Sequence, residues 1–222
     1  HRGHFAGGSG TSSVTSSSIS FTANEILLVT VGAESYYDLL VMTVTTSAAW
    51  GFTDRVDAWA EDGGPSGGYS GVFGLKIPST TSTTITCTST GIPLGWGRVS
   101  FDVWTVSGAD LTDWSVGTQE SPPTYGGPFN KTWSAAGLSG GTLAVISATD
   151  AYHRGTPYVT GDGIVSGNGY DQTPGFGVSG MGTIATWLTG GAKSMRCQEP
   201  SGYGLWATTM IEIRAAAVAP TV

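Results

Sequence analysis

The sequence predicts an all-β protein, a sandwich or jelly roll of antiparallel strands joined by long Gly-rich loops. Apolar residues alternate with a period of two in one run after another. Clusters of Gly, Pro, Ser and Asp separate these runs, and no window shows the 3.6-residue apolar stripe of an amphipathic helix. Short alternating runs between turn-forming residues are typical of sandwiches and jelly rolls.

The expected strands follow from this alternation. They lie at residues 21–33, 39–47, 68–77, 83–90 and 97–108 in the first half, and at 141–151, 175–188 and 204–214 in the second. The first strand is apolar on both sides, with Leu27, Val29 and Val31 on one face and Ile26 and Leu28 on the other. A strand of this kind needs cover on each face, which a loop or a neighbouring subunit could supply.

The chain is expected to form one domain with a free segment at each end. Residues 1–13 are rich in Gly, Ser and Thr, which predicts a flexible N-terminal arm. Residues 14–215 are expected to form a single β-sandwich domain, and residues 216–222 a C-terminal tail. The stretch SPPTYGGPF (121–129) resembles a linker, but the strands after it are too few to close a separate core. The arm could add to an exposed sheet edge of another subunit, so an ordered arm would point to a partner.

Composition excludes two classes of partner. Nine Lys and Arg residues in 222, with a net charge of −7, form no basic patch, and we expect no nucleic-acid binding. No apolar run approaches the ~20 residues that span a bilayer, so no membrane span is expected. Only 11% of residues are charged, which suits a virion surface or an extracellular location.

The two cysteines, Cys87 and Cys197, allow one disulfide bond. Cys87 alternates with Ile85 in TTITCTST, which places it on the apolar face of a strand. A buried thiol is the favoured interpretation, although the sequence leaves the pairing open, because a disulfide needs a specific geometry.

The run GDGIVSGNGYD (161–171) raises the question of a metal site. Asp162, Asn168 and Asp171 could supply oxygen ligands to calcium, which prefers such ligands on a tight turn. The favoured interpretation is a plain Gly-rich loop, with calcium as the alternative and no other cofactor expected. The nearby GFGVSG (175–180) fits the spacing of a phosphate-binding loop, but a strand-like run follows it where that site requires a helix.

No residue pattern singles out a catalytic site. The nucleophile elbow G-x-S-x-G is absent from the sequence. Asp102 shares the alternation of Trp104 on the polar face of its strand, an arrangement that suits a sugar site. An ordinary solvated face looks the same, and we favour that interpretation.

Aromatic side chains are the most prominent candidates for recognition. The chain has eight Trp residues among few charges, and exposed rings stack on sugars or anchor protein interfaces. The candidate glycan or interface aromatics are Trp59, Trp96, Trp104 and Trp206.

The order of these runs resembles a jelly-roll-like sandwich that recurs in minor tail and capsid decoration proteins of tailed bacteriophages. The resemblance covers most of residues 19–215 as a pattern and includes no catalytic signature. It implies a structural or adhesive domain. The runs that carry it are ISFTANEILLVTVGA, SAAWGFTDRV, YSGVFGLKIPSTTSTTITCTST, VSFDVWTVSGAD and LWATTMIEIRAA.

We therefore expect a non-enzymatic structural subunit of an extracellular assembly, with a bacteriophage virion as the leading assembly. Its partners would be other copies of itself or other virion proteins. One alternative is a carbohydrate-binding or adhesion module that recognises a cell-surface glycan. Another is a secreted filament subunit that polymerises by strand exchange through the N-terminal arm.

Overall fold

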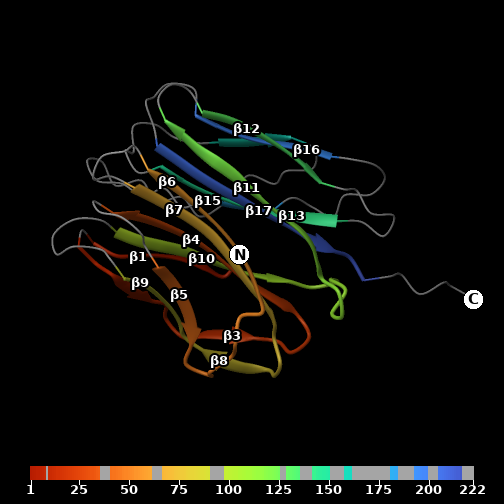
Figure 1. Cartoon of the computed structure of the whole chain (residues 1–222). Coiled ribbons are helices and arrows are strands. Elements are labelled where there is room, and N and C mark those ends of the chain that lie inside the picture. Colours follow the sequence, from red (N-terminus) through yellow and green to blue (C-terminus); the bar gives the residue numbers. More distant parts are fainter. Residues whose placement is uncertain are drawn as a thin grey trace, which may run out of the picture.

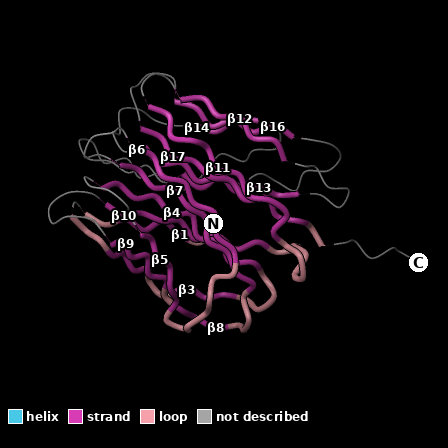
Figure 2. The backbone as a smooth tube through the Cα atoms, viewed as in Figure 1, coloured by secondary structure: helices cyan, strands magenta, loops and turns pink. Residues whose placement is uncertain are grey.

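The computed structural model describes the chain in eleven segments. These are residues 1–8, 10–35, 41–61, 67–90, 98–125, 129–135, 142–150, 158–161, 181–184, 193–199 and 205–216. Every regular element in these segments is a β-strand, and the described residues in Figure 2 are coloured as strand or loop. All strand pairs are antiparallel. The prediction of an all-β, antiparallel fold is confirmed.

The largest sheet has five strands in the order β1-β10-β4-β7-β6. Their bounds are Gly3–Ala6 (β1), Arg98–Val106 (β10), Ile26–Ser35 (β4), Gly67–Lys76 (β7) and Asp54–Glu61 (β6). We call it the central sheet, because its middle strands are buried along nearly their whole length.

Smaller sheets lie on either side of the central sheet. On one side are the sheets β2-β9-β5 and β3-β8, which we call the outer layer; on the other are β11-β17-β13-β15 and β12-β16-β14. The outer-layer bounds are Ser13–Thr15 (β2), Ile19–Phe21 (β3), Val41–Thr46 (β5), Thr81–Thr83 (β8) and Ile85–Thr90 (β9). The remaining bounds are Ser115–Tyr125 (β11), Phe129–Ala135 (β12), Thr142–Asp150 (β13), Tyr158–Gly161 (β14), Met181–Ile184 (β15), Lys193–Glu199 (β16) and Leu205–Arg214 (β17).

Figure 1 shows these sheets stacked as layers, with the outer layer below the central sheet and β11, β17 and β13 above it. Two apolar clusters hold the stack together. Leu27, Val29 and Val31 of β4 belong to the cluster shared with the outer layer. Ile26 and Leu28 belong to the cluster that includes residues of β17. The strand that is apolar on both faces is therefore covered on its second face by the chain's own C-terminal strands.

The stretch that resembles a linker is part of a strand. Residues 121–125 lie in β11, which pairs with β17. The register of this pairing shifts between Ser121 and Thr124, at the position of Pro122 and Pro123. A proline cannot donate to the ladder and is tolerated at such irregularities, which explains why the turn-like composition did not predict a strand.

The segment expected to form a flexible arm also contains strands. Gly3–Ala6 is β1, at the edge of the central sheet, and β2 begins at Ser13, one residue before the expected start of the domain. Phe5 packs against the apolar cluster between the central sheet and the outer layer. Partial burial of the Phe5 ring offsets the entropy lost on ordering this segment, which the Gly/Ser composition did not reveal. Of the expected tail, residues 217–222 lie outside the described residues.

Cys87 is a free, fully buried thiol on β9, as its alternation with Ile85 predicted. Cys197 lies in β16, and its side chain is outside the described residues.

Burial raises the pKa of the Cys87 thiol well above its usual value, so the group stays protonated near neutral pH. We expect Cys87 in a Cys197→Ser variant to resist a thiol reagent until denaturant unfolds the chain. The reagent releases a chromophore when it reacts with a thiol, and the absorbance of that chromophore measures the fraction of Cys87 that is labelled. Rapid labelling of the folded variant would contradict the buried position.

Candidate functional site

The N-terminal strand β1 docks on β10, at the edge of the central sheet. The register pairs His4 with Asp102 and Phe5 with Phe101. Hydrogen bonds extend the pairing beyond both ends of β1, because Arg2 N donates to Val103 O at 2.8 Å and Gly7 N donates to Val99 O at 3.0 Å. Backbone pairing therefore holds residues 2–7 along β10.

Two histidines of this segment contact one buried carboxylate. His1 Nε2 and His4 Nδ1 lie 3.0 and 3.1 Å from Asp102 Oδ1. The Asp102 side chain is 1% exposed, whereas the two histidines are 24% and 25% exposed. A carboxylate removed from water is costly unless hydrogen bonds or an opposite charge compensate. His1 and His4 supply that compensation, so β1 is chemically matched to this edge.

Aromatic contacts complete the docking site. The rings of His1 and Trp104 have centroids 4.4 Å apart, and those of Phe5 and Phe101 stack at 5.2 Å. Trp104 Nε1 donates to Thr30 Oγ1 at 3.3 Å, which satisfies the indole inside the protein. We call His1, His4, Phe5, Phe101, Asp102 and Trp104 the β1 docking site.

The docking site corrects two sequence-based interpretations. The face that carries Asp102 and Trp104 is not solvated, because these side chains are 1% and 4% exposed. The Trp104 ring is too buried to stack on a sugar, and it contacts the ring of His1, which precedes β1. The sequence did not reveal this, because His4 and Asp102 are 98 residues apart.

The other candidate residues fall outside the described side chains. Trp59 lies in β6 and Trp206 in β17, with side chains that are not described, and Trp96 lies outside the described residues. The candidate calcium ligands Asp162, Asn168 and Asp171 also lie outside them. Among the residues with described side chains, no group of three or more His, Cys, Asp or Glu is arranged to bind a metal ion.

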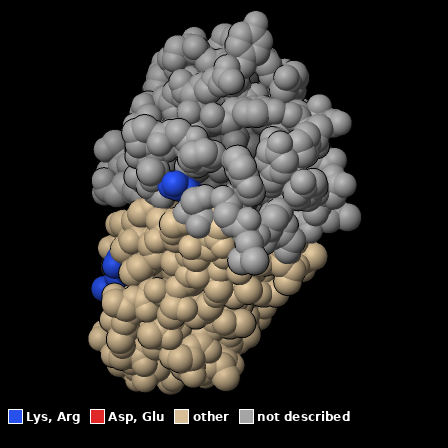
Figure 3. Space-filling model, turned by 90° about the vertical axis from the view of Figure 1, so that its left-hand side faces the viewer, with Lys and Arg blue, Asp and Glu red and all other residues tan. Residues whose placement is uncertain are grey.

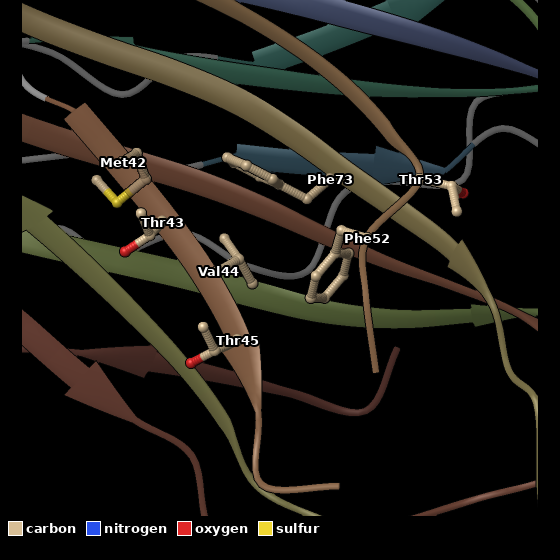
Figure 4. A pocket seen from close by; sticks show the side chains of 7 residues that line it. All are labelled: Met42, Thr43, Val44, Thr45, Phe52, Thr53 and Phe73. Atoms are coloured by element: carbon tan, nitrogen blue, oxygen red, sulfur yellow. The ribbon is translucent and has the colours of Figure 1, made fainter. Parts of the chain in front are cut away.

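A second candidate surface is an open groove beside β5. Its volume is about 350 Å³. Figure 4 shows its lining, with four side chains from β5 and three from the segments that lead into β6 and along β7. The lining residues are Met42, Thr43, Val44, Thr45, Phe52, Thr53 and Phe73.

The solvent side of the outer layer carries paired hydroxyl groups. Ser13 and Thr15 of β2 hydrogen bond to Thr88 and Thr86 of β9, each at 2.9 Å. The strands of this layer contain no charged residue. On the described part of the face in Figure 3, Lys and Arg are sparse and no Asp or Glu is visible.

The described residues contain no helix that is long and apolar enough to cross a bilayer.

Comparisons with known proteins do not assign this chain to a family. No protein-family model, no curated protein and no solved structure matches the sequence or the fold.

Proposed function

We propose that this chain is a non-enzymatic structural subunit of an extracellular assembly and acts through contacts between subunits. The observation that carries the proposal is the docking of the short strand β1 at the edge of the central sheet. We further propose that the sandwich is jelly-roll-like and that the assembly is a bacteriophage virion, with the chain as a minor tail or capsid decoration protein. The sequence pattern of residues 19–215 supports that part.

The strand β1 has the properties of an exchangeable element. It spans four residues, lies at the edge of its sheet and has a sheet neighbour only on the β10 side within the described residues. A Gly-rich turn joins it to β2: Gly10 has a φ of 75°, and Thr11 N donates to Gly8 O at 3.1 Å. Opening this turn would let β1 leave its own β10 and reach that of a neighbour.

Exchange between subunits costs little free energy, because β1 would make the same contacts with the β10 of a neighbour as it makes with its own. Phe5 would stack on a neighbour's Phe101, and His4 would contact a neighbour's Asp102. Exchange of an identical element is a low-cost route to oligomers. A reciprocal exchange gives a closed dimer, whereas a head-to-tail exchange gives an open chain, as the filament alternative requires.

We expect a chain that lacks residues 1–6 to lose the oligomers that form by strand exchange and to bind a synthetic peptide of residues 1–8. The peptide restores the contacts of Phe5, His1 and His4. Light scattering at micromolar concentration measures the mass, and calorimetric titration measures the peptide affinity.

A peptide with His4→Ala and Phe5→Ala is the matched control and should bind at least roughly tenfold more weakly, a factor that corresponds to about 1.4 kcal/mol. Should the truncated chain prove too unstable, the full-length His4→Ala, Phe5→Ala variant replaces it in the mass measurement. A full-length protein that is monomeric at all concentrations, with no peptide binding to the truncated chain, would refute the proposal.

A further inference from the structure

We propose that the open edge of β5 binds the same edge of a second copy of this chain, the two strands pairing antiparallel across a two-fold axis. The inference rests on the proposed function, because it names a second contact between subunits. It uses a different surface from the β1 docking site.

Most edge strands of the described sheets carry a recognisable protection against such pairing. Charged residues, proline, irregular register and very short length are the devices that natural sheets use. The edge strands β1, β2, β14 and β15 and both strands of the β3-β8 sheet span only three or four residues. The longer protected edges are β6, with Asp54, Arg55, Asp57 and Glu61; β11, with Pro122, Pro123 and a register shift; and β12, with Lys131.

The strand β5 has none of these devices. It spans six residues, VMTVTT, without a charge or a proline, and its register with β9 is regular. Among the described strands, β9 is its sheet neighbour on one side, and no strand follows on the other. Val41, at its start, is 53% exposed. An unprotected edge with an exposed apolar residue is the arrangement that invites another strand.

The groove beside β5 supplies the apolar contacts that an added strand needs. Met42 and Val44 line it from β5, and Phe52 and Phe73 line it from the other side. Figure 4 shows Phe52 and Phe73 beside the edge of β5. A strand that adds to a sheet edge gains backbone hydrogen bonds, and its alternate side chains enter adjoining pockets.

The sequence of β5 is complementary to itself. With the axis at Thr43, this residue opposes its own copy, Val41 opposes Thr45, and Met42 opposes Val44. Residues that oppose each other in an antiparallel pair point to the same face, so the core-facing side chains meet one another and the hydroxyl groups meet on the solvent side. The exposed Val41 would be covered by Thr45 of the second copy. Hydroxyl pairs of this kind already join β2 to β9.

Charge also favours a second copy as the occupant. Each copy carries a net charge of −7, so two copies repel one another on average. The strands of the outer layer contain no charged residue, so pairing between two β5 strands brings no like charges of these strands together. These strands also offer no counter-charge to an acidic or basic partner.

Substitution of residue 43 tests the inference in the full-length protein. In Thr43→Lys, two like charges would oppose each other on the axis, and we expect the dissociation constant of the dimer to rise roughly tenfold or more. The matched control is Thr15→Lys, which adds the same charge to an exposed position on β2 at the opposite edge of the sheet. We expect this control to leave the dissociation constant unchanged. Sedimentation velocity measures it, and thermal unfolding verifies that both variants fold.

A mixture of Thr43→Lys with Thr43→Glu should restore the dimer, since opposite charges then oppose each other on the axis. A dimer that forms equally well in Thr43→Lys and in the unmodified chain would overturn the inference. If deletion of residues 1–6 abolishes that dimer, the proposed function stands without the β5 contact. If the deletion has no effect but Thr43→Lys separates the copies, the β5 contact stands and strand exchange fails. A protein that is monomeric throughout refutes both.

Discussion

Replacing Phe101 with alanine is expected to lower the free energy of unfolding by about 3–5 kcal/mol. Phe101 is fully buried in the cluster between the central sheet and the outer layer, and it is among the largest fully buried side chains. Its ring also stacks on Phe5 at 5.2 Å. The substitution therefore leaves a cavity and removes the main apolar contact of β1.

Urea denaturation measures the loss, and hydrogen exchange at the Arg2 and Gly7 amides, which donate to β10, shows whether β1 detaches. The control is Ser18→Ala, which is expected to change the free energy of unfolding by no more than about 0.5 kcal/mol, because Ser18 is exposed and lies outside both proposed contacts between copies. If Phe101→Ala does not fold, Phe101→Leu provides a milder test. A loss below about 1 kcal/mol for Phe101→Ala would show that this side chain is not a central core residue.

Gly74→Ala is expected to destabilise the protein by about 1–3 kcal/mol, the usual cost of forcing an extra group into a filled core. Gly74 lies in the buried strand β7, and a Cβ at this position would overlap the indole of Trp114. Trp114 is itself 6% exposed in the cluster that includes β17, so the ring has little room to move. The glycine is required for the close approach of Trp114 to the central sheet.

Two further variants identify the cause of this loss. Gly51→Ala is the control, because a Cβ there meets no atom within 4 Å, and we expect it to be neutral or slightly stabilising. In a Trp114→Ala background, Gly74→Ala should lose its destabilising effect, giving a coupling energy of about 0.5–3 kcal/mol in urea denaturation. Equal losses with and without the Trp114 ring would contradict the proposed overlap.

The local pattern of the sequence identified most strands of the core, but it missed β6, whose Val56 is buried in the cluster with β17. Period-two alternation gave the strand at β4 with its two apolar faces, and the positions of β9, β10 and β17 to within a few residues. It also gave the buried Cys87, which shares a face with Ile85. These features depend on neighbours two residues apart, so a single sequence reveals them.

The sequence failed where distant residues decide the outcome. The arm at residues 1–13 reads as flexible, yet Phe5 and His4 find partners about 100 residues later on β10. Asp102 reads as solvated, yet two histidines and the burial of its strand remove it from water. The composition of residues 121–125 is typical of a linker, yet these residues belong to β11, which pairs with β17.

The sequence by itself determined that this protein is an all-β chain with few charges, with one strand that is apolar on both faces and with strands rich in Ser and Thr. Only the tertiary structure decided which strand covers which face, that β1 pairs with β10 and that β5 is the last of the described strands in its sheet. The physical reason is that alternation reports which side chains avoid water, whereas sheet order depends on long-range pairing. The strand β5 alternates like its neighbours, and its place as the last strand of its sheet distinguishes it.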